Sequence, residues 1–184
     1  MFRQEKYDSA NPVVRGLIGR FFAKIGGLIG ELGPASLLDA GCGEGEMFRR
    51  ISLPDGARTV LFDRNPESAA QVFGSVDALP FPSHSFDVVT CLEVLEHLAD
   101  PCAAAREHAR VARRAAVVSV PYEPYFRIGN VLRGKHLSRL GDHPEHVQHW
   151  NPRTFHKFLA GSFREVRVIE SLPWIIACCH PDRS

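Results

Sequence analysis

The stretch that decides the fold is residues 37–45, Leu-Leu-Asp-Ala-Gly-Cys-Gly-Glu-Gly, where an apolar strand leads into three glycines and then into helix-forming residues. The glycines, at positions 41, 43 and 45, allow a sharp turn at backbone angles that a Cβ atom would penalise. A ligand in this turn would meet the free N–H groups of a helix that begins near Glu44. The pattern predicts a cradle for a nucleotide-like ligand.

One position separates this loop from the dinucleotide-binding fingerprint. The pattern G-x-G-x-x-G requires glycine at position 46, where this chain has Glu46. A carboxylate is poorly suited to lie beside a pyrophosphate, so the loop favours a nucleoside ligand without phosphates over NAD. A dehydrogenase is therefore disfavoured.

Acidic residues follow the next apolar segments. The strand at 59–62 ends in Asp63, about twenty residues past the glycines, where a carboxylate can accept hydrogen bonds from both hydroxyls of a ribose. The apolar run 72–76 ends in Asp77, and the strand that begins at Phe86 ends in Glu93. Because a parallel sheet places the carboxyl ends of its strands along one edge, we expect these groups to line one site.

Together these motifs resemble the class I S-adenosylmethionine-dependent methyltransferases, over residues 11–179. The resemblance implies that the glycine loop wraps the methionine part of S-adenosylmethionine and that Asp63 holds its ribose. It also implies adenine contacts from residues 77–79, a floor beneath the sulfonium from residues 91–93, and S-adenosylhomocysteine as the product. The expected cofactor-binding residues are Asp39, Gly41, Cys42, Gly43, Glu44, Gly45, Asp63, Arg64, Asp77, Ala78, Leu79, Cys91 and Leu92.

The order of elements predicts an α/β fold. Continuous apolar runs such as 117–120 are typical of strands that are covered on both faces. We expect a doubly wound, mainly parallel, Rossmann-like sheet of seven strands with helices on both faces, closed by an antiparallel hairpin from the runs 163–170 and 174–179. The expected helices are 12–32, 47–53, 66–73, 101–113 and 152–160, and the other expected strands are 37–40, 58–63, 72–76, 86–91 and 115–120.

Length and composition fit a single domain over residues 1–184, in which residues 121–151 form an insert that shapes the acceptor pocket. The 45% hydrophobic and 23% charged content is ordinary for a globular domain, and a net charge of +1 predicts no strong overall attraction to nucleic acid or anionic lipid. No run is long enough for a membrane span, so we expect a cytoplasmic protein. The five cysteines form no C-x-x-C pair, which indicates reduced and mostly buried thiols.

Histidine is enriched near the expected acceptor pocket, because five of the nine histidines fall within residues 136–156. A neutral imidazole, with a pKa of about 6.5, can take the proton from a hydroxyl as that hydroxyl attacks a methyl group. The candidates for this base are His146, His149 and His97, in that order, with Glu93 as a further catalytic residue.

A divalent-metal site is the alternative for the same residues. Glu93, Glu96 and His97 have the spacing i, i+3 and i+4, which places them on one face of a helical turn. With His146 they resemble the ligand set of small-RNA 3′-terminal 2′-O-methyltransferases, which implies a metal-dependent RNA methyltransferase. The same motif is widespread in metal-free small-molecule methyltransferases, including ubiquinone-pathway O-methyltransferases, so the metal is not favoured. In a third interpretation, Glu96 and His97 only cap and pack their helix.

The expected partner is a small-molecule or lipid-linked methyl acceptor. Arginines gather on the helix expected at 101–113, but few aromatic residues accompany the basic residues of the insert, so the sequence disfavours nucleic acid as a partner. Residues 126–140 interleave apolar and basic side chains, which predicts peripheral contact with a membrane. A non-catalytic, cofactor-binding regulatory domain is a further alternative.

Overall fold

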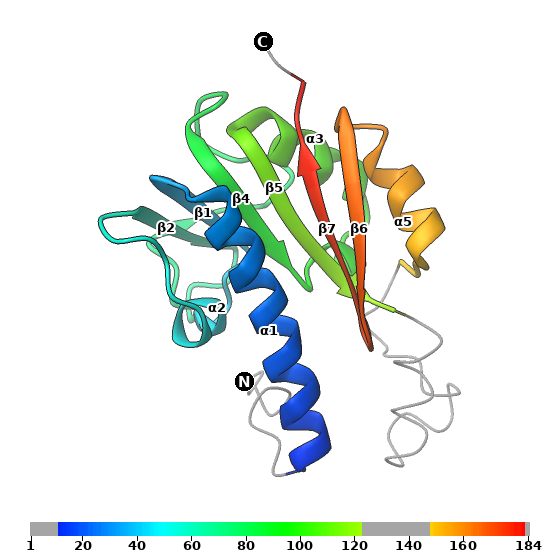
Figure 1. Cartoon of the computed structure of the whole chain (residues 1–184). Helices are drawn as coiled ribbons and strands as arrows, with labels where there is room; N and C mark the ends of the chain where they lie inside the picture. Colours follow the sequence, from blue (N-terminus) through cyan, green and yellow to red (C-terminus); the bar gives the residue numbers. More distant parts are fainter. Residues whose placement is uncertain (1–10, 123–147, 183–184) are drawn as a thin grey trace.

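The computed structural model describes residues 11–122 and 148–182, and its centre is one seven-stranded sheet (Figure 1). The strand order is β3-β2-β1-β4-β5-β7-β6, and only β7 runs antiparallel to its neighbours. The strands are β1 (Ser36–Ala40), β2 (Arg58–Asp63), β3 (Val72–Phe73), β4 (Phe86–Leu92), β5 (Ala112–Pro121), β6 (Glu165–Ser171) and β7 (Trp174–His180). This order confirms the expected fold class, including the C-terminal hairpin.

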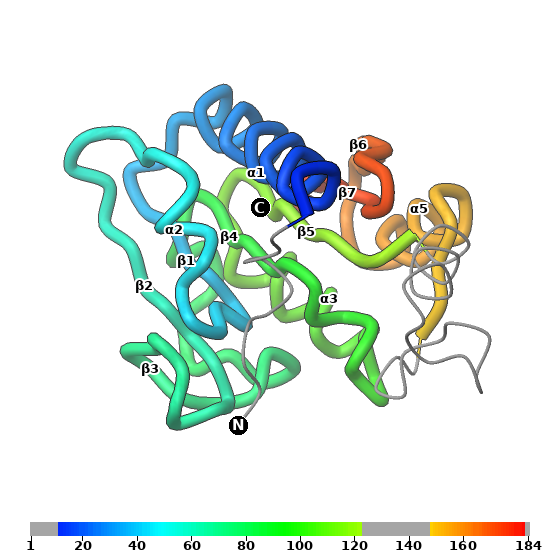
Figure 2. Tube along the Cα trace, turned by 90° about the horizontal axis from the view of Figure 1, so that it is seen from below, coloured from blue at the N-terminus to red at the C-terminus, as the bar shows by residue number. Residues whose placement is uncertain are grey.

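Helices cover both faces of the sheet. They are α1 (Pro12–Leu32), α2 (Glu46–Arg50), α3 (Pro101–Val111) and α5 (Pro152–Leu159), with a short 3-10 turn η1 (Leu95–His97). Helix α1 packs on one face and α3 on the other, as Figure 2 shows from below, and α5 packs on the α3 side. Consecutive strand residues supply the two cores: Leu37 packs with α1, whereas Leu38 packs on the α3 side. The continuous apolar runs therefore follow from a sheet buried on both faces.

Helix α1 begins and ends as its sequence predicts. The Asn11 side chain accepts a hydrogen bond from the Val13 N–H at 2.9 Å, and Gly33 ends the helix at φ +52° with its N–H bonded to the Ile29 carbonyl. The first buried side chain of the helix is Ile18, and of the six helical residues before it Val14 and Leu17 pack against the core while partly exposed.

The helix predicted at 66–73 is wrong, because turns and strand β3 occupy that segment. Short polar side chains bond to nearby backbone groups there: Asp63 accepts from the Asn65 N–H at 2.8 Å, and Asn65 accepts from the Glu67 N–H at 3.0 Å. Such local bonds compete with helical hydrogen bonds. The predicted strand at 72–76 is also shorter, since β3 contains only Val72 and Phe73.

Two other helices are shorter than predicted. Helix α2 has five residues, and α3 ends at Val111. Arg113 and Arg114 consequently lie on β5 and not beside Arg106 and Arg110 on a helix. Arg113 forms an ion pair with Asp87, whose carboxylate also accepts the Ala35 and Ser36 N–H groups. The arginine cluster expected on one helix is therefore divided between two elements.

Most of the predicted insert, residues 123–147, lies outside the described residues. So do His146 and residues 126–140, for which the sequence predicts contact with a membrane. At the two ends of this segment, Tyr122 and Trp150 form an isolated β-bridge. Within 11–122 and 148–182, no helix has the length and apolar character needed to cross a bilayer. All five cysteines are free, as expected, and Cys102 alone among them is exposed.

Candidate active site

The glycine loop after β1 has the backbone conformation that its sequence predicts. Gly41, Gly43 and Gly45 have φ angles of +84°, +53° and +77°. The N–H groups of Gly41 and Cys42 both donate to the Phe62 carbonyl, at 2.7 and 3.1 Å, which ties the loop to β2. A Cβ atom on Gly41 would lie only 2.4 Å from a methyl carbon of Val94, so this position accepts no side chain without movement.

Asp63, at the end of β2, holds the same loop from the side. One carboxylate oxygen accepts the Gly43 N–H at 2.8 Å, and the other accepts the Asn65 N–H at 2.8 Å. A carboxylate offers about four acceptor positions, so these two bonds leave room for ligand hydroxyls. Asp63 can therefore position the loop and accept from a ribose at the same time.

Asp39 lies beneath the loop and does not line the cavity described below. It is buried, and its carboxylate accepts a hydrogen bond from the Thr90 hydroxyl at 2.8 Å. Burial raises the pKa of Asp39 to about 7; the Thr90 bond opposes this effect, and the charge of Asp63 adds to it. Asp39 is thus a supporting group that can change its protonation state near neutral pH.

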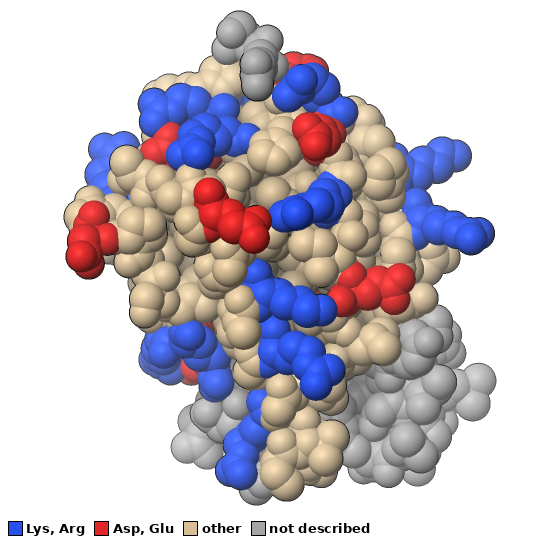
Figure 3. Space-filling model, viewed as in Figure 1, with Lys and Arg blue, Asp and Glu red and all other residues tan. Residues whose placement is uncertain are grey.

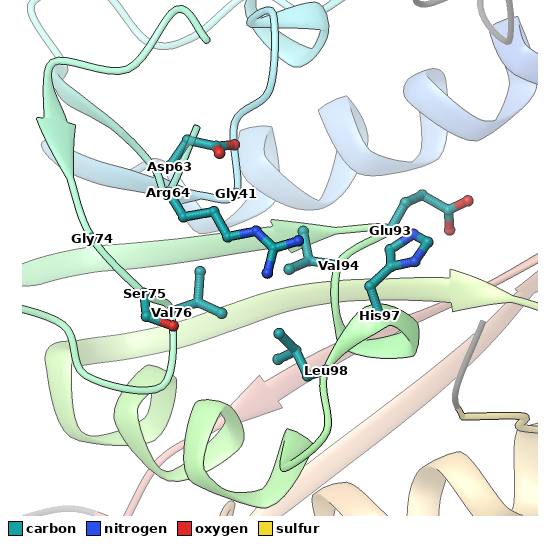
Figure 4. Close-up of a pocket in the computed structure, with 10 residues that line it drawn as sticks. All are labelled: Gly41, Asp63, Arg64, Gly74, Ser75, Val76, Glu93, Val94, His97 and Leu98. Atoms are coloured by element: carbon teal, nitrogen blue, oxygen red, sulfur yellow. The ribbon is translucent and has the colours of Figure 1, made fainter. Parts of the chain in front are cut away.

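A cavity of about 480 Å³ opens at the carboxyl ends of β1, β2, β3 and β4. It is lined by Gly41, Asp63, Arg64, Gly74, Ser75, Val76, Glu93, Val94, His97 and Leu98 (Figure 4). Its volume lies within the range of about 300–1,000 Å³ that is usual for small-molecule sites. In Figure 4 the Arg64 side chain extends across the cavity toward Val94.

The residues after β3 that line the cavity come earlier in the chain than the sequence predicted. Gly74, Ser75 and Val76 line it, whereas the expected residues 77–79 do not. Asp77 and Ala78 are exposed, and Leu79 is buried with its N–H donated to Glu107 at 2.8 Å. Because β3 ends at Phe73, Gly74 is the first residue past the strand. The continuous apolar run 72–76 gave no indication that the strand ends at Phe73, so the predicted cavity residues lie too late in the chain.

The other expected cofactor residues lie outside the cavity lining. The Cys42 thiol is buried, and burial raises its pKa to about 12; Cys91 is fully buried in β4, which raises its pKa well above the usual value. Neither thiol is therefore ionised at neutral pH. Leu92 packs on the α1 side of the sheet, and Glu44 is exposed in the loop.

At the end of β4 the chain turns sharply at Glu93, whose φ is +59°. This conformation costs a residue with a Cβ atom about 1–3 kcal/mol. The Glu93 carboxylate accepts a hydrogen bond from the Trp174 indole N–H at 2.7 Å, and a bond to a charged group contributes about 1.5–3 kcal/mol. The two magnitudes are comparable, so the contact with Trp174 can offset the backbone strain.

This turn separates the three residues expected on one helical face. Only 95–97 form the 3-10 turn, and Glu93 precedes it in a left-handed conformation, so that prediction is wrong. His97 lines the cavity with its Nε2 3.9 Å from a carboxylate oxygen of Glu96, which is only 1% exposed. In Figure 4 the Glu93 carboxylate points away from the cavity.

Within the described ranges, no group of three His, Cys, Asp or Glu side chains could hold a metal ion. The fourth member of the expected ligand set, His146, lies outside those ranges. His149 is described and exposed but does not line the cavity. Its neighbour Gln148 donates its N–H to the Glu96 carbonyl at 3.2 Å, which brings the end of the insert beside η1.

Comparison with known proteins accounts for this arrangement. Residues 38–120, which include the loop, Asp63 and the β4 turn, match the family described as "Methyltransferase domain". The ubiquinone biosynthesis O-methyltransferase of Hahella chejuensis is 37% identical over 95 residues, which is 44% of this chain and 40% of that protein. Over residues 38–120 the chain is a class I S-adenosylmethionine-dependent methyltransferase domain. The family expected from the sequence is thereby confirmed, with S-adenosylmethionine as its cofactor.

Solved structures show the same fold over the whole methyltransferase domain. A putative methyltransferase complexed with the Haloferax volcanii Trm112 activator has a TM-score of 0.65 at 16% identity, and the match covers 98% of each chain. The small RNA methyltransferase HEN1 has a TM-score of 0.69 at 20% identity, over 100% of this chain and 27% of that one. The chain spans about 40% of the length of the curated relatives it matches.

Proposed function

We propose that the chain transfers a methyl group from S-adenosylmethionine to a hydroxyl oxygen of a small-molecule or lipid-linked acceptor. The observation that carries the proposal is the cavity that joins Gly41, Asp63 and His97 at one sheet edge. The hydroxyl acceptor is suggested by the similarity to ubiquinone biosynthesis O-methyltransferases. When bound, the cofactor supplies a methyl group that is activated by the positive charge on its sulfur.

The residues of the cavity fit this cofactor. The glycine loop leaves space where side chains would otherwise lie, and Asp63 offers acceptors for two ribose hydroxyls. Ser75 and Val76, which follow β3, would meet the adenine in place of residues 77–79. Most of the rate enhancement would come from holding the two reactants in line, since effective molarities in such sites are large.

His97 is the described candidate base that lines the cavity. It would take the proton of the acceptor hydroxyl, and the Glu96 carboxylate at 3.9 Å would stabilise the resulting imidazolium. His149 lies next to the segment that contacts η1 and is the second candidate. His146 stays a prediction from the sequence.

A lipid-linked acceptor is supported by the surface of α1. Helix α1 carries Arg15, Arg20 and Lys24, and its residues 12–30 contain no acidic side chain. Positive side chains run down the lower half of the face shown in Figure 3. Val13, 69% exposed, lies in the first turn of α1, before the first buried side chain of the helix. Basic side chains beside exposed apolar ones suit contact with an anionic membrane surface. We propose the cytoplasmic side of such a membrane as the working location.

Transfer of radiolabelled methyl groups to matched acceptors tests the proposal. The purified protein would receive a catechol, the corresponding aromatic diamine and the dithiol, each with and without a prenyl chain. We expect label in the catechol, with higher kcat/KM when the prenyl chain is present. The variant His97→Ala should lower kcat by about 10²- to 10⁴-fold while the cofactor Kd changes little.

Other outcomes of the same assay identify the alternatives. Label in the amine or the thiol alone would contradict the hydroxyl acceptor. Binding of S-adenosylmethionine without transfer to any acceptor would favour a regulatory domain. Transfer to the 3′ end of a short RNA, abolished by EDTA and restored by Mg²⁺, would favour the metal-dependent RNA enzyme.

A further inference from the structure

We infer that Trp174 is a positioning residue for the cofactor cavity and that it acts through the Glu93 carboxylate. The inference rests on the proposed function, because it concerns the same cavity. Trp174 is the first residue of β7 and lies 81 positions after Glu93 in the sequence. It contributes no atom to the cavity lining.

The indole of Trp174 is fixed from two sides. Its Nε1 donates a hydrogen bond to a Glu93 carboxylate oxygen at 2.7 Å, and its ring packs on Phe21 of α1 with centroids 4.7 Å apart. Trp174 is 3% exposed and Phe21 is fully buried, so little water can compete for either contact. The carboxylate is therefore anchored to the N-terminal helix and to the C-terminal hairpin together.

The anchored carboxylate belongs to the turn that forms one side of the cavity. The Glu93 N–H donates to the Ser119 carbonyl at 3.1 Å, and the Ser119 hydroxyl lies 3.5 Å from the other carboxylate oxygen. The turn at Glu93 directs Val94 against Gly41 and begins η1, which carries His97 into the cavity. Movement of the carboxylate would thus move both the loop contact and the candidate base.

The indole of Trp174 makes two different contacts, a ring contact with Phe21 and a hydrogen bond to Glu93, and a substitution can remove the second while keeping the first. A phenylalanine at position 174 would preserve the ring contact with Phe21, whereas only tryptophan supplies the N–H that Glu93 accepts. Trp174→Phe consequently removes the link to the cavity and leaves most of the core contact in place. Glu93→Gln keeps an oxygen that can accept the same bond.

A double-mutant cycle tests the link. We would measure the Kd of S-adenosylhomocysteine and the melting temperature for Trp174→Phe, Glu93→Ala and the double variant. Trp174→Phe should raise Kd by roughly 5- to 20-fold in the wild-type background, as expected for a lost bond to a charged group, but by less than about twofold beside Glu93→Ala. An unchanged Kd in Trp174→Phe, or the same fold increase in both backgrounds, would overturn the inference.

Fluorescence provides a second readout that does not require Trp174→Phe to fold. The chain has two tryptophans, so Trp150→Phe leaves Trp174 as the only tryptophan, which can be excited selectively over the three tyrosines. In that background, S-adenosylhomocysteine should change the Trp174 emission; the change should persist with Glu93→Gln and disappear with Glu93→Ala. Emission that does not respond to bound S-adenosylhomocysteine would contradict the link.

These results also distinguish the inference from the proposed function. If calorimetry detects no S-adenosylhomocysteine binding to the wild-type protein, the proposed function fails first. If binding is intact and Trp174→Phe leaves both affinity and emission response unaltered, only the role of Trp174 is refuted.

Discussion

The turn after β1 and the turn after β4 form adjoining sides of one cavity, but they are built differently. After β1, three glycines adopt positive φ angles, and they do so without a steric penalty because they have no Cβ atom. After β4, Glu93 adopts φ +59° and carries a side chain that is held by Trp174 from β7. The first turn depends on local backbone freedom and the second on a distant side chain, yet they meet where Gly41 lies against Val94.

The largest effect is expected where the two turns meet. Gly41→Ala would place a Cβ atom 2.4 Å from Val94 at a φ of +84°, which should cost about 2–5 kcal/mol of stability and abolish cofactor binding. Thermal melts and calorimetric titration would measure both losses. Gly43→Ala is the matched control, because its Cβ atom would have no neighbour within 4 Å, and it should cost only about 1–2 kcal/mol.

Adding Val94→Ala to Gly41→Ala sharpens this prediction. The methyl groups that clash would then be absent, so the double variant should regain stability relative to Gly41→Ala alone. If the double variant is no more stable than the single one, the contact between the two turns does not limit the site.

Asp63→Ala should have the next largest effect, because Asp63 holds the first turn through the Gly43 N–H. We expect the Kd of S-adenosylmethionine to rise by about 10- to 100-fold, equivalent to one or two hydrogen bonds to a charged group. Calorimetry measures this change directly. Asp63→Asn keeps one acceptor oxygen and should fall between wild type and Asp63→Ala; equal affinity in all three proteins would remove Asp63 from the ribose site.

The pH dependence of S-adenosylmethionine binding tests the role of Asp39, which lies beneath the first turn. Burial raises the pKa of Asp39 to about 7, so the cofactor-free protein favours the protonated carboxyl and loses stability as pH rises from about 4 through 7. A positively charged cofactor favours the ionised form, so binding should release a proton and strengthen from pH 6 to pH 8. The gain should be roughly fivefold if binding lowers the pKa by one unit.

Titrations of S-adenosylmethionine in buffers with different ionisation enthalpies would count the released protons. In Asp39→Asn the proton release and the pH dependence should both disappear. Identical proton release in wild type and variant would assign the titration to another group.

The smallest effect is expected at Gly27, a glycine in helix α1 that does not adopt a positive φ angle. A Cβ atom on Gly27, in the middle of α1, would have no neighbour within 4 Å. Gly27→Ala should stabilise the protein by about 0.5–1 kcal/mol, because alanine has the higher helix propensity, and cofactor affinity should not change. Destabilisation measured by denaturant titration would indicate that this face of α1 is in contact with another part of the chain.

The contrast between the two turns also explains what the sequence could predict. The glycines and strand ends act through nearby backbone, and Asp63 follows a strand end about twenty residues past the glycines, so their spacing predicted the first turn, the position of Asp63 and the sheet. The bond between Glu93 and Trp174 joins residues 81 positions apart and leaves no local pattern. The expected helix at 66–73 failed for the opposite, local reason, since Asp63 and Asn65 accept hydrogen bonds from N–H groups two residues away, and these bonds outweighed an ordinary helical composition.

Hydrogen exchange with and without S-adenosylhomocysteine tests the central claim most directly, because it locates the bound cofactor on the chain. The account predicts slower amide exchange in peptides that cover residues 41–45, 63–64, 74–76 and 93–98. Peptides around Gly161 and Ser162, which line a separate hollow, should not change. Binding that protects the second group and not the first, or no protection at saturating ligand, would contradict the assignment of the cofactor to the two turns.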